Sequence, residues 1–285
     1  MPFDYAFTPS RGPDRSQAAR WAHEAVAAIE RGSYVTPSGR TVELAPGLAR
    51  MLEGTRDLPP EAAVAPFVGG SLDTRFSVLN GTSLAAARAM TNAGRTDEPL
   101  VLNFASAKNP GGGFLGGARA QEESLAWSST LYRSLCTSGM YDFHRAQKDP
   151  LYTHWMIHSP HVTVFREDGG ALLEVPYDCA FLTSPAPNAG VVLERNPGRH
   201  AEVEAAMDAR IDRVLAIAAE RGHRRLVLGA WGCGVFRNDP RYVARSFARA
   251  FEGPAKGVFD EVVFAVLDWS PERRFVRPFA EQFAP

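Results

Sequence analysis

The sequence predicts an α/β fold, a three-layer α/β/α domain with a mixed central sheet and an N-terminal accessory extension. Segments of strand and helix character alternate from about residue 71 onward, a pattern typical of a largely parallel or mixed sheet with helices on both faces. The 285 residues, of which 45% are hydrophobic and 22% charged, suffice for one large domain with an extension. Two glycine-rich loops directly follow predicted strands, where ligands bind in such folds.

Residues 1–70 are predicted to form the accessory extension and residues 71–285 the main domain. Seventy residues are too few for a convincing core of their own, so the extension must pack on the rest of the chain. Apolar side chains recur at helical spacing from Arg15 to Arg31, and Gly32 then ends the helix. The further elements expected here are two short strands around a Pro-Ser-Gly turn within residues 34–44, a short helix near residues 47–52 and a connection over residues 59–70.

The main domain shows helix and strand patterns in regular succession. Its longest amphipathic helix begins near Ala201 and stops at Gly222, and Asp239-Pro240 marks the start of another. Helical spacing of apolar residues continues from Gln121 to Cys136, which predicts one helix there. The expected strands lie at residues 76–79, 100–104, 161–166, 179–183, 226–228 and 262–267, and the other expected helices at residues 82–93, 241–251 and 271–279.

Charge and cysteine content exclude several classes of protein. A formal net charge of −1 argues against binding nucleic acid through bulk positive charge, so a polyanionic ligand would need a local site. The three cysteines have no CxxC spacing and indicate neither a disulfide framework nor a zinc ribbon. Because no apolar run approaches the ~20 residues of a membrane span and the first 20 residues lack a signal-peptide layout, we expect a cytoplasmic protein without a membrane partner.

The candidate active site is the glycine-rich stretch at residues 109–123, behind the strand at residues 100–104. Three consecutive glycines at residues 111–113 let the backbone turn through positive φ and present N–H groups to a phosphate or a ribose. The Gln-Glu-Glu sequence at residues 121–123 then falls on the first turn of a helix that faces the loop. The same pattern would also suit a surface turn followed by acids that complement the helix dipole.

A second glycine cluster at residues 229–236 follows the strand at residues 226–228. Successive N–H groups in a Gly-x-Gly turn form an anion nest, which could hold a diphosphate without a lysine. The cluster is neither a P-loop nor a dinucleotide fingerprint, because no Gly-Lys-Ser/Thr follows and the glycine spacing differs. Two glycine loops, each at the end of a strand, fit one ligand with two ends better than either fits alone.

A triple glycine followed six to eight residues later by Gln-Glu-Glu resembles the signature of the poly(ADP-ribose) glycohydrolases. The flanks at residues 101–108 and at Ser124-Leu125 are similar to the compact bacterial-type branch of that family, and the resemblance covers roughly residues 77–266. The resemblance implies that the main domain is a macrodomain. The partners it implies are poly(ADP-ribose), ADP-ribose and poly(ADP-ribosyl)ated proteins, without a cofactor, a metal or direct contact to nucleic acid, and a monomer is expected.

The resemblance also implies roles for the two glutamates. Glu123 would protonate the leaving ribose oxygen and then activate water against an oxocarbenium-like centre, while Glu122 would hold ribose hydroxyls and Gln121 would orient the ligand. Neighbours on a helix differ by about 100° in direction, so only one glutamate can point squarely at the reacting oxygen. In ordinary glycosidases, by contrast, two carboxyls flank the bond.

The substrate-binding residues expected are Asn103, Gly111, Gly112, Gly113, Gln121, Gly232, Cys233, Gly234, Val235 and Phe236. By resemblance, residues 232–236 match the family's diphosphate loop, and Phe236 matches an aromatic residue that orders the distal ribose. Residues 185–188 (Pro-Ala-Pro-Asn) also look like a family element and are expected to wall the pocket. Asn103 keeps a second interpretation as a satisfied turn asparagine, and Phe236 keeps one as a core residue.

Two further chemistries are disfavoured by the sequence. Cys233 could act as a nucleophile, but no His or acid accompanies it locally to form the thiolate. His154, His158 and His161 are spaced like zinc ligands on a helix. However, Pro160 precedes the last of them and no fourth ligand is offered by the spacing, so surface or core histidines are expected.

Three functions are compatible with these patterns. The first is a hydrolase that cleaves ribose–ribose bonds of poly(ADP-ribose), with attack from chain ends as the resemblance to the bacterial branch suggests. The second is a non-catalytic macrodomain that only binds ADP-ribose. The presence of both Glu122 and Glu123 favours the enzyme, because a binding module has no use for an acid beside its ligand's anomeric carbon. The third, a phosphatase-like hydrolase of ADP-ribose derivatives, would normally show clustered metal ligands.

Overall fold

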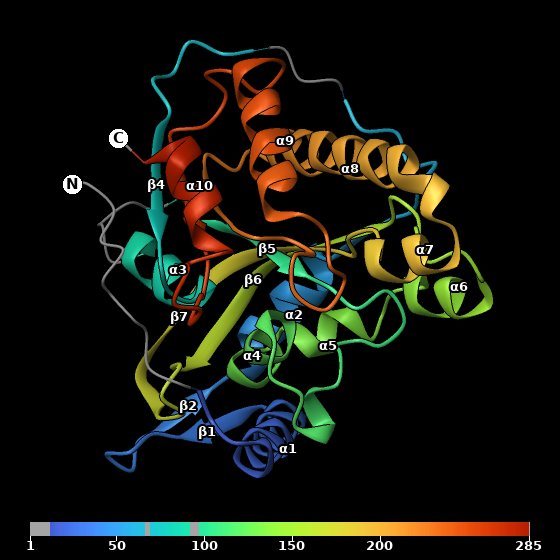
Figure 1. Ribbon diagram of the computed structural model, residues 1–285. Coiled ribbons are helices and arrows are strands. Elements are labelled where there is room, and N and C mark those ends of the chain that lie inside the picture. The colour runs from blue at the N-terminus through green and yellow to red at the C-terminus, as the bar shows by residue number, and fades with distance from the viewer. Residues whose placement is uncertain (1–11, 66–68, 92–96, 285) are drawn as a thin grey trace.

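The computed structural model describes residues 12–65, 69–91 and 97–284, and its centre is a seven-stranded mixed sheet (Figure 1). Its strand order is β3-β6-β7-β5-β8-β9-β4, in which every pair from β7 to β4 is parallel and β6 is antiparallel to both of its neighbours. The mixed sheet predicted from the alternating pattern is therefore confirmed. The strands are β3 (Arg56–Leu58), β4 (Arg75–Leu79), β5 (Leu100–Phe104), β6 (Met156–Arg166), β7 (Leu172–Ser184), β8 (Arg225–Leu228) and β9 (Glu261–Ala265).

Helices cover both faces of the sheet and complete the three predicted layers (Figure 1). Side chains of β5 point alternately to the two faces, so Leu100 and Leu102 join one apolar core and Val101 joins the other. The helices on the first face are α8 (His200–Glu220), α9 (Pro240–Glu252) and α10 (Val276–Phe283). Those on the second face are α2 (Ala45–Gly54), α3 (Ser83–Thr91), α4 (Gln121–Ser128), α5 (Leu131–Leu135) and α6 (Met140–Ala146).

The N-terminal segment packs on the second face and supplies the edge strand β3. Its helix α1 (Arg15–Arg31) has the predicted bounds, because the Asp14 carboxylate accepts the N–H of Gln17 at 2.8 Å and Gly32 ends the helix at φ 76°. The predicted hairpin is β1 (Ser33–Val35) and β2 (Thr41–Glu43). One side of α1 packs against α4 and against the short 3₁₀ helix η1 (Phe114–Gly116), which lies in the glycine-rich stretch before α4.

The single helix predicted from Gln121 to Cys136 is wrong, since the chain breaks between α4 and α5. Ser129 is extended and bridges to Val164 of β6, and its hydroxyl donates to Leu125 O at 2.7 Å. The N–H of Thr130 donates to Thr163 O at 3.0 Å. The N–H of Thr130 is thus bonded to strand β6, whereas in a continuous helix it would donate to the carbonyl four residues earlier.

The last predicted helix begins later than expected, at Val276 instead of residue 271. The Asp268 carboxylate accepts the N–H groups of Phe275 at 2.8 Å and Val276 at 3.1 Å, which fixes the start of α10 there. Strands β6 and β7 are also longer than predicted. Residues 92 and 93, expected at the end of α3, lie outside the described residues. The elements that the sequence did not predict are β3, α6, α7 (Ala189–Arg195), η1 and the 3₁₀ helix η2 (Pro197–Arg199).

Within the described ranges, none of the helices combines the length and the apolar character needed to cross a bilayer.

Candidate active site

The two glycine loops lie side by side because β5 and β8 are adjacent parallel strands. The first loop runs from residue 105 to 120 and joins β5 to α4, and the second runs from residue 229 to 239 and joins β8 to α9. Both leave the carboxyl ends of their strands, which is the edge where ligands bind in open α/β sheets. The structure thus brings together two clusters that are more than 100 residues apart in the sequence.

The first loop requires glycine at its centre. Gly111 and Gly112 have φ values of 67° and 62°, in the left-handed region that favours glycine. A Cβ on Gly112 would lie 2.3 Å from Glu123 Oε1 and 3.0 Å from Glu122 Oε2. Both carboxyl groups therefore sit directly beneath the loop backbone, as the sequence predicted for acids on the first turn of α4.

Glu123 ties the glycine loop to the start of α4. Its Oε1 accepts the N–H of Gly113 at 2.9 Å, and its Oε2 accepts the N–H of Ala120 at 2.9 Å. The second bond is the carboxylate half of a capping box, which is common at the third position of a helix. The side chain is 8% exposed, so it is nearly enclosed but still reaches the loop interior.

Glu122 is more deeply buried and only partly satisfied. Its Oε2 accepts the N–H of Ser106 at 2.6 Å, whereas its Oε1 has no hydrogen-bond partner within the described chain. Burial raises the pKa of the Glu122 carboxyl well above its usual value, and the neighbouring charge of Glu123 raises it further. Both effects favour the protonated form of Glu122 relative to that of an exposed glutamate.

Asn103, the penultimate residue of β5, lies beside Glu122. Its Nδ2 donates to Thr183 Oγ1 at 3.1 Å, but its buried Oδ1 is not matched by any donor in the part of the chain that the structure describes. A satisfied turn asparagine, the second interpretation from the sequence, does not describe this geometry. Asn103 Oδ1 and Glu122 Oε1 are thus two buried oxygens of neighbouring side chains that lack a donor within the described chain.

Gln121 is engaged by the protein itself. Its Oε1 accepts the N–H of Phe104 at 2.9 Å, and its Nε2 donates to Leu102 O at 2.8 Å and to Ser83 Oγ at 3.1 Å. Both amide hydrogens are used, so the side chain locks α4 to β5 and α3. The Gln-Glu-Glu sequence therefore combines one side chain that fixes the helix with two carboxyls held under the loop.

The second loop also depends on glycine. Gly232 has φ 72°, and a Cβ there would lie 2.5 Å from Ala186 Cβ and 2.6 Å from Asn238 Nδ2. Gly234 differs, because a Cβ added to it would meet nothing within 4 Å. The backbone at Gly234 therefore borders open space, and Val235 beside it is 82% exposed.

Cys233 lies in this loop but is not activated. The thiol is buried, its Sγ lies 3.6 Å from Trp231 O, and burial raises its pKa. A neutral thiol of this kind is a poor nucleophile. Phe236 is half-buried, with its ring centroid 6.0 Å from that of Tyr152.

The segment at residues 185–188 is bonded to the second loop, next to the site. Asn238 Nδ2 donates to Pro187 O at 2.8 Å, and Trp231 Nε1 donates to Ser184 O at 3.1 Å. The N–H of Gly190 donates to Phe236 O at 2.9 Å. Asn188 then caps α7, since its side chain accepts the N–H of Val191.

The three histidines considered as zinc ligands have separate protein partners. His158 bonds to His223 with an Nε2–Nε2 distance of 2.9 Å, and His154 Nδ1 accepts from Arg210 Nε at 3.3 Å. His161 lies 3.6 Å from the Glu98 carboxylate. Across the described residues, no group of three or more His, Cys, Asp or Glu side chains is arranged to hold a metal ion.

Some residues at the site were not found from the sequence. Ser106 supplies the N–H for Glu122 and lies in the family-like flank at residues 101–108, but no role was predicted for it; Tyr152, which packs on Phe236, belongs to no recognisable local motif. Only the tertiary fold brings Tyr152 next to the second loop.

Comparison with known proteins identifies close relatives of this chain. The family model described as microbial-type PARG, catalytic domain, matches residues 22–167, where PARG stands for poly(ADP-ribose) glycohydrolase. The structure of the poly(ADP-ribose) glycohydrolase from Thermomonospora curvata is 47% identical, with a TM-score of 0.88 and coverage of 94% of this chain and 100% of that chain. The structure of the T. curvata enzyme bound to the inhibitor ADP-HPD has the same identity and coverage and a TM-score of 0.87.

The poly(ADP-ribose) glycohydrolase from Deinococcus radiodurans in complex with ADP-ribose is 45% identical, with a TM-score of 0.77 and coverage of 84% of this chain and 98% of that chain. A search of curated protein sequences gives no match.

The fold and the paired loops define a macrodomain-like hydrolase. The chain belongs to the microbial-type poly(ADP-ribose) glycohydrolases. The family match begins at residue 22, earlier than the residue 77 expected from the resemblance. The packing of α1 against η1 and α4 gives a physical reason, because the N-terminal helix supports the loop that carries the glutamates.

Proposed function

We propose that this enzyme hydrolyses ribose–ribose O-glycosidic bonds of poly(ADP-ribose) and releases ADP-ribose held between the two glycine loops. The observation that carries the proposal is the pair of buried oxygens, Asn103 Oδ1 and Glu122 Oε1, that lack a donor in the described structure. An unpaired buried polar atom costs about 1–3 kcal/mol. Ribose hydroxyls are donors that would satisfy both atoms, and relatives bind ADP-ribose and ADP-HPD in their crystals.

We assign the proton transfer to Glu123. Its Oε1 borders the inner side of the loop at Gly112, where a reacting sugar would lie under the glycine backbone. The acid donates its proton to the leaving ribose oxygen as the bond from that oxygen to the anomeric carbon breaks. The carboxylate that remains takes a proton from water as the water oxygen attacks the oxocarbenium-like carbon, which restores the acid.

Glu122 holds the sugar in this scheme. Its Oε1, which has no partner within the described chain, can accept a hydrogen bond from a ribose hydroxyl. Burial raises the pKa of the Glu122 carboxyl, and this disfavours a second negative charge beside Glu123. Gln121 acts on the ligand indirectly, by fixing the position of α4 through its bonds to Leu102 and Ser83.

The second loop would hold the diphosphate. Its N–H groups around Gly232 and Gly234 form a candidate anion nest, and the open space beside Gly234 leaves room for the ligand. Phe236, supported by the ring of Tyr152, would order the distal ribose. Cys233 is a packing residue in this proposal.

Incubation of purified protein with poly(ADP-ribose) in the presence of EDTA tests the activity. The expected product is free ADP-ribose, and attack from chain ends predicts monomers from the earliest times. Binding of the polymer without any product would indicate the non-catalytic reader instead. Early release of long internal fragments would contradict attack from chain ends while leaving the hydrolase activity intact.

A further inference from the structure

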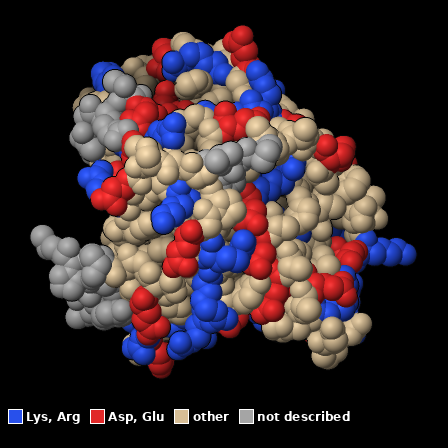
Figure 2. All heavy atoms as spheres, turned by 90° about the horizontal axis from the view of Figure 1, so that it is seen from above, with Lys and Arg blue, Asp and Glu red and all other residues tan. Residues whose placement is uncertain are grey.

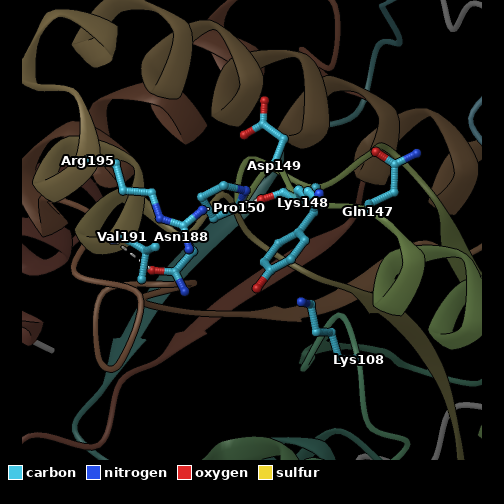
Figure 3. A pocket seen from close by; sticks show the side chains of 9 residues that line it. Lys108, Gln147, Lys148, Asp149, Pro150, Asn188, Val191 and Arg195 are labelled. Carbon is cyan, nitrogen blue, oxygen red and sulfur yellow. Dashed lines mark hydrogen bonds between the residues drawn. The ribbon is translucent and has the colours of Figure 1, made fainter.

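A polar pocket of about 210 Å³ lies between the first glycine loop and the segments at residues 147–152 and 188–195 (Figure 3). It is smaller than the ~300–1,000 Å³ of pockets that enclose a whole small molecule, so it suits one group of a larger ligand. Lys108 reaches it from the first glycine loop, whereas Arg195 and Asn188 approach from α7 on the other side (Figure 3).

The pocket lining carries more positive than negative side chains. Lys108, Lys148 and Arg195 line it, and none of the three forms an ion pair among the residues that the structure describes. Asp149, the one acid in the lining, pairs with Arg199, which donates to its two oxygens at 2.8 and 3.2 Å and also pairs with Glu202 at 2.8 Å. The chain has three lysines in all, and two of them lie here.

The pocket is joined to the proposed reaction centre through short contacts. The N–H of Lys108 donates to Ser106 Oγ at 3.3 Å, and the N–H of Ser106 in turn holds Glu122. Tyr152 in the pocket wall packs on Phe236. Lys108 and Tyr152 therefore connect the pocket to the two loops of the proposed site.

The wall is preorganised by a buried arginine. Arg210 donates to Leu151 O at 2.7 Å and to Pro185 O at 2.8 Å, and so joins the two segments that flank the pocket. Tyr152 is held at φ 55°, a left-handed conformation that is uncommon for a bulky residue. Such strain persists where surrounding contacts determine the conformation, often at ligand sites.

We propose that this pocket is a second anionic subsite, which binds the diphosphate of the neighbouring ADP-ribose unit, the unit whose ribose oxygen leaves. The inference rests on the proposed hydrolysis of poly(ADP-ribose). In that polymer every unit carries a diphosphate, so the leaving unit brings two negative charges close to the bond that breaks. Lys108, Lys148 and Arg195 attract these charges, and the subsite favours the polymer over ADP-ribose linked to an uncharged group.

The test compares two substrates that differ only on the leaving side. One is poly(ADP-ribose), and the other is an aryl glycoside of ADP-ribose, whose leaving group has no diphosphate. Lys148→Ala and Arg195→Ala, alone and combined, should raise KM for the polymer, by about 5-fold or more for the pair, since partly exposed ion pairs are individually weak. The kcat/KM for the aryl glycoside and the Kd for ADP-ribose should stay at the wild-type values.

Lys148→Glu should raise KM for the polymer further, and the effect should shrink at high salt because the attraction is screened. The matched control is Lys256→Glu, which changes the same residue type at an exposed position beyond the far end of α9, about 20 Å along a 13-residue helix. Unchanged polymer kinetics in the pocket variants would overturn the subsite, as would an equal loss on both substrates. A wild-type protein that cleaves neither substrate would instead refute the proposed function.

Discussion

Glu122 and Glu123 are neighbours in the chain, yet their surroundings differ at the level of single atoms. Both oxygens of Glu123 accept loop N–H groups, whereas Glu122 keeps one buried oxygen without a partner in the described structure. The difference follows from the 100° step between helix neighbours, which directs one carboxyl at the glycine loop and the other at Asn103. The sequence places two acids here, but only the fold assigns their surroundings.

Replacement of Gly112 tests the close approach of loop and carboxyls. Gly112→Ala puts a Cβ 2.3 Å from Glu123 Oε1 at a φ of 62°, so we expect both carboxyls to shift and activity to fall by at least about 10-fold. The matched control in the same loop is Gly116→Ala, whose Cβ would meet nothing within 4 Å. Initial rates on poly(ADP-ribose) measure both variants, and equal rates would show that the close approach does not matter.

Substitutions at Gly234 and Cys233 test the roles proposed for the second loop. Gly234→Leu should fold, because its side chain enters open space, but should abolish binding of ADP-ribose by filling the proposed diphosphate site.

Cys233→Ala should retain most of the activity, since its buried thiol has a raised pKa and is not a ready nucleophile. Calorimetry and thermal melting separate binding from folding. A loss of turnover in Cys233→Ala with normal affinity for ADP-ribose would support Cys233 as the nucleophile.

At the scale of elements, helix α1 supports the first glycine loop. Arg15 Nε donates to Gly116 O at 3.0 Å, and Arg119 donates to Pro13 O at 2.8 Å. Trp21 packs edge-on against Trp127 of α4 with ring centroids 6.1 Å apart, and the buried Arg166 donates to Trp127 O and to Glu24. We therefore assign the N-terminal extension the role of holding α4 in place.

Removal of Trp21 tests this support. Trp21→Ala should lower the free energy of unfolding by about 3–5 kcal/mol, as for other large-to-small changes at buried aromatic residues. Turnover on poly(ADP-ribose) should also fall in the folded fraction, because α4 carries both glutamates. Trp269, which is 44% exposed, provides the matched control Trp269→Ala. Wild-type turnover in a folded Trp21→Ala protein would show that the packing of α1 on α4 does not affect the active site.

The elements that the sequence predicted well have local signals. Gly32 ends α1 and the apolar run of β5 is buried, so both bounds follow from neighbouring residues. The break after α4 depends on the bridge between Ser129 and Val164, and the start of α10 depends on Asp268, so neither could be read from local spacing. The glycines and glutamates were found because they are contiguous, whereas the pocket cations come from three separate segments.

At the scale of the whole molecule, the charge is mixed. Basic and acidic side chains are interspersed on the face shown in Figure 2, in keeping with a net charge of −1. A polyanion then has no broad positive surface on this face to bind. Affinity must come from local features such as the glycine loops and the proposed cation pocket.

Buried histidines make the stability of the molecule depend on pH. Burial, followed by the proximity of His223, lowers the pKa of His158 to about 3, and burial also lowers the pKa of His223. The unfolded chain takes up these protons near pH 6.5, so it binds more protons than the folded chain below that pH. The stabilisation is present above pH 6.5 and is lost as the pH falls toward 3.

His158→Gln should therefore reduce the loss of folding stability as the pH falls. His158 contributes a slope of up to about 1.4 kcal/mol per pH unit between its unfolded pKa near 6.5 and its folded pKa of about 3, and the variant lacks this contribution. Urea unfolding at several pH values measures the slope, and His23→Gln at an exposed position of α1 should keep the wild-type slope. A wild-type slope in His158→Gln would show that this pair does not control acid unfolding.

The most direct test of the proposed chemistry compares Glu123→Gln with Glu122→Gln for kcat on poly(ADP-ribose) and Kd for ADP-ribose. Glu123→Gln should lose a factor of about 10²–10⁴ in turnover and bind ADP-ribose as the wild type does, because a positioned acid–base group contributes that much. Glu122→Gln should bind more weakly as well as turn over more slowly. Normal turnover in Glu123→Gln, together with an inactive Glu122→Gln of intact affinity, would contradict the assignment and exchange the two roles.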